Sequence, residues 1–204
     1  MKRTAVSLGV CWLVLIFPLT VLADLTIEIT KGVDNPTRIG ISPITRDGRS
    51  LPEDVSKIVS ADLQRSGLFR PIPKENMLSF PSTVKEVYYR DWRILGVEYL
   101  VVGKTSLRDD VYQITFSLVE VHSSRVVFTK VVKGSNNQLR DLAHYISDEV
   151  YQAVTGIPGA FSTRVAYVSA LPSSGKMQFK LMVADVDGAR ERLLLESKQP
   201  IMSP

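Results

Sequence analysis

Hydrophobic and polar residues alternate along several short stretches of the chain, which is the period of a β-strand with one buried face. The clearest run is Val111–Val121, where Tyr112, Ile114, Phe116 and Leu118 form the apolar side. Comparable runs predict further strands over Leu25–Thr30, Arg38–Ile44, Leu68–Ile72, Val97–Leu107 and Val126–Lys133. We expect Leu68–Ile72 at a sheet edge, because Pro71 has no backbone N–H to donate.

Three segments are predicted to be helical, namely Pro52–Ser66, Val84–Leu95 and Asn137–Thr155, and each is followed by a glycine that can end it. The first helix is expected to be capped near Ser50 or Leu51, and the third at Asn136. Two of the helices carry an apolar stripe at the helical period. The expected buried residues are Val55, Ile58, Val59 and Leu63 in the first, and Leu139, Leu142, Ala143, Ile146, Val150 and Val154 in the third.

Strands joined by hairpins and combined with three helices predict an α+β fold with a mixed sheet over residues 24–160. After the linker Ile157–Ala160, the pattern over residues 161–204 is that of strands alone. We expect strands at Thr163–Ser169, Gln178–Ala184 and Glu191–Glu196, with a loop at Leu171–Lys176. Three antiparallel strands cannot bury an apolar face alone, which predicts the opening strands of a larger β-repeat array.

The first 23 residues combine a basic start with a long apolar run that ends in Val21-Leu22-Ala23. This pattern predicts a signal peptide over residues 1–23, with Asp24 as the first residue of the mature chain. The alternative is a retained membrane anchor, because the run is long enough to span a bilayer. The signal peptide is favoured, since Pro18 interrupts the run and no basic cluster follows it.

Composition narrows the function classes further. Two of the 25 basic residues, Lys2 and Arg3, lie in the leader, so the remainder nearly balances the 21 acidic residues. No basic block remains, and nucleic acid is therefore not an expected partner. The single cysteine, Cys11, also lies in the leader, so the mature chain is expected to have no disulfide and no thiolate metal site.

Candidate chemistry in the sequence is weak, with no phosphate-binding loop, serine elbow or metalloprotease helix. We interpret His122 and His144 as solvent-facing residues rather than a catalytic pair. Asp185 and Asp187 fit a hairpin turn better than a calcium loop. The serine–lysine spacing in Ser173–Lys176 lies in a predicted loop rather than at the start of a helix. No catalytic residue, cofactor or metal ion is therefore expected.

Two surface features also have plain structural interpretations. Arg90, Arg93, Lys104 and Arg108 could form a basic patch, but three aspartates interleave with them: Asp91, Asp109 and Asp110. Tyr88, Tyr89 and Trp92 have helical spacing and are interpreted as core and rim residues rather than a ligand cage.

The predicted strand at the mature N-terminus is of greater interest. A terminal strand is held by one hydrogen-bonded ladder, so it can detach and pair with the sheet edge of another protein. The alternative is a permanently docked edge strand, which the physics of the strand alone favours.

A set of stretches, in order along the whole mature chain, carries a resemblance to a known family. The stretches are Leu25–Ile29, Gly32–Asp34, Ile39–Ile41, Leu63–Phe69, Asp91–Gly103, Ala143–Asp148, Thr155–Phe161, Thr163–Val168 and Asp185–Gly188. Together they resemble the TolB family of the periplasmic Tol–Pal envelope system. The resemblance implies an N-terminal α/β domain followed by a six-bladed β-propeller, of which residues 161–204 would be the opening strands.

The resemblance also implies a function, namely a monomeric periplasmic adaptor without enzymatic activity. Such an adaptor links the C-terminal domain of TolA to the peptidoglycan-associated lipoprotein Pal, and supports outer-membrane integrity and cell division. Pal contacts mainly the propeller, and the mature N-terminal segment contacts TolA. By position, the TolA-binding residues here would be Asp24, Leu25, Thr26, Ile27, Glu28, Ile29, Thr30, Lys31, Gly32 and Val33. With the resemblance included, the detachable strand becomes the favoured interpretation.

Two other function classes stay open on the sequence. One is a periplasmic peptidase or hydrolase whose propeller precedes a catalytic domain beyond residue 204, since fold alone does not exclude an enzyme. The other is a solute-binding domain, which is weakened because the chain lacks two similar lobes.

Overall fold

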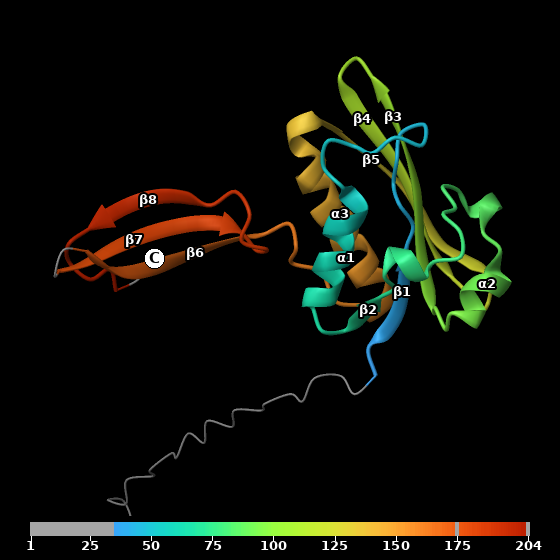
Figure 1. Cartoon of the computed structure of the whole chain (residues 1–204), viewed down its shortest axis with the longest axis horizontal. Coiled ribbons are helices and arrows are strands. Elements are labelled where there is room, and N and C mark those ends of the chain that lie inside the picture. The colour runs from blue at the N-terminus through green and yellow to red at the C-terminus, as the bar shows by residue number, and fades with distance from the viewer. Residues whose placement is uncertain (1–34, 174–175, 203–204) are drawn as a thin grey trace, which may run out of the picture. The chain divides into compact units, whose positions relative to one another are not determined.

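The computed structural model describes residues 35–173 and 176–202, which form a five-stranded sheet with helices on both faces and a separate three-stranded sheet (Figure 1). Within these ranges, none of the helices has the length and apolar character needed to cross a membrane. The predicted leader and the predicted strand Leu25–Thr30 lie outside the described residues.

The five-stranded sheet is mixed and has the order β2-β1-β3-β4-β5. Its strands are β1 (Thr37–Ile41), β2 (Phe69–Pro71), β3 (Tyr99–Arg108), β4 (Val111–Glu120) and β5 (Arg125–Ser135). The short β1 runs parallel to β2 and β3, whereas β3, β4 and β5 form antiparallel hairpins. The mixed sheet and the edge position of β2 are confirmed.

Helices α1 (Val55–Arg65) and α3 (Leu139–Thr155) cover one face of this sheet (Figure 1). All residues of the two predicted stripes are buried or partly buried in the core between helices and sheet. On the sheet side, the apolar positions of β4 that alternation predicted reach the same core: Tyr112, Ile114, Phe116 and Leu118. The apolar stripes of the two helices, which repeat every 3.6 residues, thus pack against the apolar side of β4, which repeats every two residues.

The predicted helix starts were wrong, although the ends were right. The cap of α1 is Asp54, whose carboxylate accepts a hydrogen bond from the Lys57 amide at 3.1 Å. Leu51, one of the predicted caps, is buried in the core instead. Before α3, Asn136–Gln138 forms the 3-10 turn η3, and Ser135 closes a capping box with Gln138. Asn136 is therefore not the cap, because the serine one residue earlier takes that role.

The opposite face is covered by short segments, and here the predicted helix Val84–Leu95 was wrong. The structure has a 3-10 turn η2 (Val84–Glu86) and a short helix α2 (Tyr89–Ile94), separated by extended backbone at Val87. Val87 is buried in the second core, which explains the break, because extended backbone directs this side chain inward. A further 3-10 turn, η1 (Lys74–Asn76), precedes them.

Trp92 of α2 packs against the sheet where β1 has a glycine. Trp92 is 1% exposed, and a Cβ atom added to Gly40 would lie 2.8 Å from its ring and 2.9 Å from Leu100. The absence of a side chain at Gly40 therefore makes room for the largest residue of the second core. The interpretation of Trp92 as a core residue is confirmed, while Tyr88 is 71% exposed at the rim.

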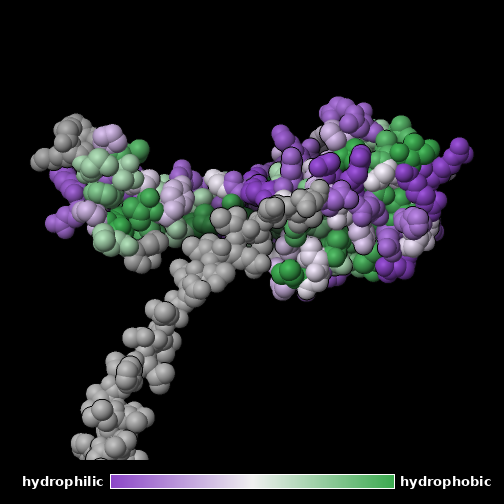
Figure 2. Space-filling model, turned by 90° about the horizontal axis from the view of Figure 1, so that it is seen from below, coloured by the Kyte–Doolittle hydropathy of each residue, from purple (hydrophilic) through white to green (hydrophobic). Residues whose placement is uncertain are grey.

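The second sheet has the strand order β6-β7-β8 and is antiparallel throughout. Its strands are β6 (Arg164–Ser173), β7 (Lys176–Asp185) and β8 (Arg192–Ser197). The predicted loop Leu171–Lys176 was wrong, since both strands extend into it. Hydrophobic side chains stay exposed along all three strands, as Figure 2 shows: Val165, Tyr167, Leu171, Met177, Leu193, Leu194 and Leu195. Such a sheet leaves much apolar surface uncovered.

The close approach of Gly40 and Trp92 predicts an overpacking defect. We expect Gly40→Ala to lower the free energy of unfolding by about 1–3 kcal/mol, because the new methyl group has no room beside the indole ring. Urea unfolding measures this change. In a Trp92→Leu background the same substitution is expected to cost clearly less, and strictly additive losses would contradict the proposed contact.

Candidate functional site

The residues with the strongest functional expectation, Asp24–Val33, precede the described part of the chain. The structure describes where the chain enters the sheet. Strand β1 begins at Thr37, and its Arg38 amide donates to the Glu98 carboxylate at 3.1 Å. In return, the Glu98 amide donates to the Arg38 carbonyl at 2.9 Å. The start of β1 is thus fixed between two neighbouring strands.

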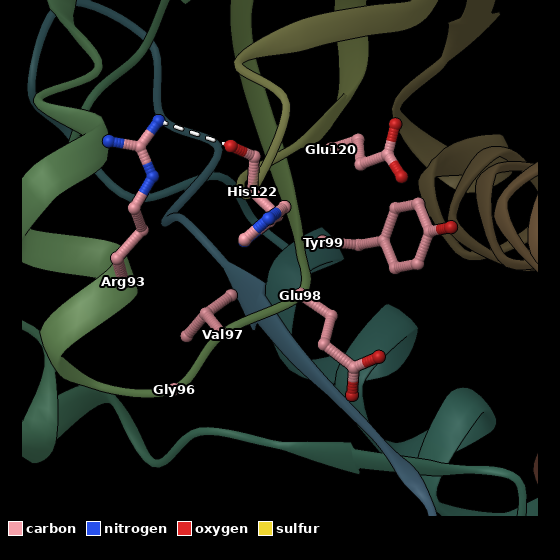
Figure 3. Close-up of a pocket in the computed structure, with 7 residues that line it drawn as sticks. All are labelled: Arg93, Gly96, Val97, Glu98, Tyr99, Glu120 and His122. Carbon is pink, nitrogen blue, oxygen red and sulfur yellow. Dashed lines mark hydrogen bonds between the residues drawn. The ribbon is translucent and has the colours of Figure 1, made fainter.

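A surface pocket lies at the end of the sheet where β3 begins and β4 ends (Figure 3). The ring of Tyr99 lies between the carboxylates of Glu98 and Glu120, and Arg93 extends from α2 toward the turn that follows β4. The Arg93 guanidinium donates to the carbonyls of Val121 and His122 at 3.2 and 3.3 Å. Arg93 therefore holds the turn and leaves the two carboxylates as the main charged groups of the pocket.

The surroundings of two pocket residues shift their pKa values in opposite directions. Burial raises the pKa of Tyr99, and the neighbouring Glu120 and Glu98 carboxylates add to that effect, so the phenol stays neutral. The Ser123 hydroxyl and then Arg125 lower the pKa of Glu120, which keeps its charge.

The structure does not bring the weaker sequence candidates together. Arg93 lies near the Tyr99 end of the β3–β4 hairpin, whereas Arg108 pairs with Val111 at the opposite end, so the basic patch does not form. Ser173 ends β6 and Lys176 begins β7, with two residues between them outside the described ranges. His122 is exposed next to the pocket, as expected.

The expectation for His144 was wrong, because this residue is 2% exposed. Its Nδ1 atom lies 2.7 Å from Asp62 Oδ2, and the Ser147 hydroxyl donates to the same carboxylate oxygen at 2.8 Å. Asp62 is fully buried on α1, while His144 and Ser147 lie one turn apart on α3. Serine and histidine both point at the aspartate rather than at each other, so this is not the geometry of a nucleophile and its base.

The turn between β7 and β8 reaches the same cluster through its aspartates. Asp187 Oδ2 lies 3.8 Å from His144 Nε2 and accepts a hydrogen bond from Arg140 of α3. Asp185 accepts from Arg190 at 2.6 Å, and Arg190 also binds Asp141 at 2.5 Å. The preference for a hairpin turn over a calcium loop at Asp185–Gly188 is confirmed, since the residues close a turn that is paired with arginines.

Burial by itself raises the pKa of Asp187, but three partners outweigh it and the net shift is downward. These partners are the Ala189 amide, the Arg140 guanidinium and the His144 ring. Asp62, His144 and Asp187 are also the residues whose potential metal-ligating atoms lie within 4.8 Å of one another. The Arg140 guanidinium occupies the Asp187 oxygen nearest the histidine, which disfavours a metal cation there.

Sequence reasoning missed this cluster, although a partial signal exists. Arg140, His144 and Ser147 are spaced by four and three residues, which places polar groups on the face of α3 that also carries the apolar stripe. Asp62 likewise interrupts the stripe of α1. A polar residue within each of two buried stripes indicates a buried polar contact.

A comparison with protein families matches residues 25–127 to the TolB amino-terminal domain. Among curated proteins, the Tol-Pal system protein TolB of Marinomonas sp. (strain MWYL1) is 48% identical over 97% of this chain and 46% of the relative. The protein of the same name from Pseudomonas syringae pv. syringae (strain B728a) is 44% identical over 87% of this chain and 42% of the relative.

Among solved structures, TolB from Acinetobacter baumannii is similar, with a TM-score of 0.74 and 31% identity. The match covers 87% of this chain and 43% of the solved one. The chain therefore spans less than half the length of the relatives that it matches.

The contact between Arg140 and Asp187 predicts a stability defect with a defined pH dependence. Because the pKa of Asp187 is lowered in the folded state, its charge stabilises the fold above the ordinary value of 3.8, and this contribution disappears as the pH falls below it. We expect Arg140→Gln to cost about 3 kcal/mol at pH 7, because it removes the guanidinium that donates to the largely buried carboxylate of Asp187. Urea unfolding at pH 7 and pH 3 tests this, and the defect is expected to shrink at pH 3.

Arg125→Gln is the matched control, because Arg125 pairs with Glu120 on the exposed surface. This variant is expected to change stability little. An equal loss of unfolding free energy in the two variants would show that burial of the Arg140–Asp187 contact does not strengthen it.

Proposed function

The chain belongs to the TolB family, and from this premise we propose that it acts in the periplasm as a non-enzymatic adaptor of the Tol–Pal system. The observation that carries the proposal is the match of 87% of the chain to a solved TolB structure. Curated relatives are named as Tol-Pal system proteins rather than as enzymes. The proposed partners are the C-terminal domain of TolA and the lipoprotein Pal.

The proposed TolA-binding segment is Asp24–Val33. Its alternating pattern places Leu25, Ile27 and Ile29 on one side, where they would pack against the partner. Glu28 and Lys31 would set register and charge complementarity.

We propose that residues 161–204 are the first strands of the β-propeller and that residues 24–160 form the N-terminal domain. The exposed hydrophobic residues of β6, β7 and β8 support the first part, because further blades would cover such surface. Contact with Pal is assigned mainly to those further blades.

Export through a signal peptide over residues 1–23, cleaved after Ala23, would place the mature chain in the periplasm. The basic start and the apolar run of the sequence support this step. Cleavage would free Asp24 as the N-terminus of the TolA-binding segment.

Deletion of Asp24–Val33 from the full-length protein is expected to abolish binding to the TolA C-terminal domain, measured by calorimetry. A finer test uses the two sides of the strand. Ile27→Ser removes an aliphatic group from the side proposed to pack against TolA and is expected to weaken binding by about tenfold or more. Thr26→Ser, on the other side, is the control and is expected to change affinity little. Undiminished affinity after the deletion would refute the mechanism.

A further inference from the structure

His144 has one ring nitrogen with a partner and one without. The same Asp62 oxygen accepts from Ser147, so Nδ1 is assigned as the donor of the 2.7 Å hydrogen bond. Nε2 is buried, makes no hydrogen bond, and lies 3.8 Å from Asp187 Oδ2. If Nε2 held only a lone pair, this buried hydrogen-bond acceptor would face a second acceptor, the Asp187 carboxylate. Two buried acceptors without a shared proton repel each other, which costs free energy.

Two occupants could remove this conflict, namely a metal cation or a proton. A cation bound by Nε2 would match a familiar arrangement in which the other histidine nitrogen donates to a carboxylate. However, the Arg140 guanidinium already donates to Asp187 Oδ2 and also lies 3.7 Å from Asp185. A proton on Nε2 adds the charge without needing further ligands, and it turns the contact with Asp187 into an attraction.

The charges of the whole cluster favour the proton as well. The carboxylates that face one another in this network outnumber the guanidiniums by one. The carboxylates belong to Glu53, Asp62, Asp141, Asp185 and Asp187, and the guanidiniums to Arg65, Arg140, Arg164 and Arg190. One additional positive charge on the imidazole ring brings the sum of these charges to zero, and it lies beside the buried carboxylates of Asp62 and Asp187, where an unbalanced charge costs most.

We propose that His144 is an imidazolium that bridges Asp62 of α1 and Asp187 of the β7–β8 turn. The ring donates from Nδ1 to Asp62, and its positive charge attracts Asp187 across 3.8 Å, so a single residue of α3 contacts both the other helix and the β7–β8 turn. His144 is thus a positioning residue for the turn. This inference uses no partner protein and is independent of the proposed binding to TolA.

Long-range proton–nitrogen NMR of the histidine rings in the full chain at pH 7 tests the protonation. Both nitrogens of His144 are expected to give signals of the protonated type. In Asp187→Asn the Nε2 signal is expected to change to the lone-pair type, whereas Asp141→Asn, which removes a carboxylate that binds Arg190, leaves it protonated. A lone-pair signal in the parent chain would overturn the proposal.

The metal alternative is tested in the same spectra. Zn²⁺ is added alone to chain previously stripped with a chelator, and the His144 signals are expected to stay in place. A selective displacement of the Nε2 signal by Zn²⁺ would overturn the proton bridge in favour of a metal site.

The positioning role is tested by amide hydrogen exchange in the turn. His144→Asn keeps an amide donor near Asp62 but nothing that reaches Asp187. The Ala189 amide, which donates to Asp187 Oδ1 at 2.9 Å, is expected to exchange about tenfold faster, because Asp187 loses the positive charge that faces it. His122→Asn is the matched control, and the β4 amides report whether each variant is folded. Unchanged exchange at Ala189 in folded His144→Asn would overturn the positioning role. If His144→Asn does not fold, the NMR spectra of Asp187→Asn still show whether Asp187 keeps Nε2 protonated.

Discussion

The structure depends on one sheet whose two faces are both buried. Strands β3 and β4 send alternate side chains into two separate cores, one under α1 and α3 and one under the segments around α2. Leu100 and Val102 face one layer and Val101 faces the other, so the register of these strands leaves little freedom for slippage. The two layers differ in kind: regular helices pack on one face, and short turns built around Trp92 pack on the other.

The helical layer contains an exception to its apolar character. Asp62 and His144 occupy positions within the two stripes that meet between α1 and α3, and they satisfy each other there. Buried polar pairs of this kind contribute less to stability than to the choice of one arrangement over others. In this chain the arrangement also includes Asp187, and therefore a turn more than forty residues away along the sequence from His144.

If the chain acts as the adaptor that we propose, such an organisation separates two tasks. The sheet and its two cores provide a rigid frame, and the segment that we propose to bind TolA lies before its first described strand. The pocket that includes Glu98, Tyr99 and Glu120 lies at the end of the sheet where β3 begins. Its two glutamates give this end of the sheet an acidic surface.

The elements that depend on periodicity alone were predictable from the sequence. Alternation in Val111–Val121 defined β4, and the stripes of α1 and α3 defined both helices and their buried faces, because one face of each element must be apolar. Local capping was less predictable, since Asp54 and Ser135 compete with other polar residues nearby. What only the tertiary structure decided was the pairing of parallel β1 with β2 and β3, the extended backbone at Val87, and the burial of His144. In each case the determining partner is distant along the chain, and a linear pattern carries no information about which distant groups will meet.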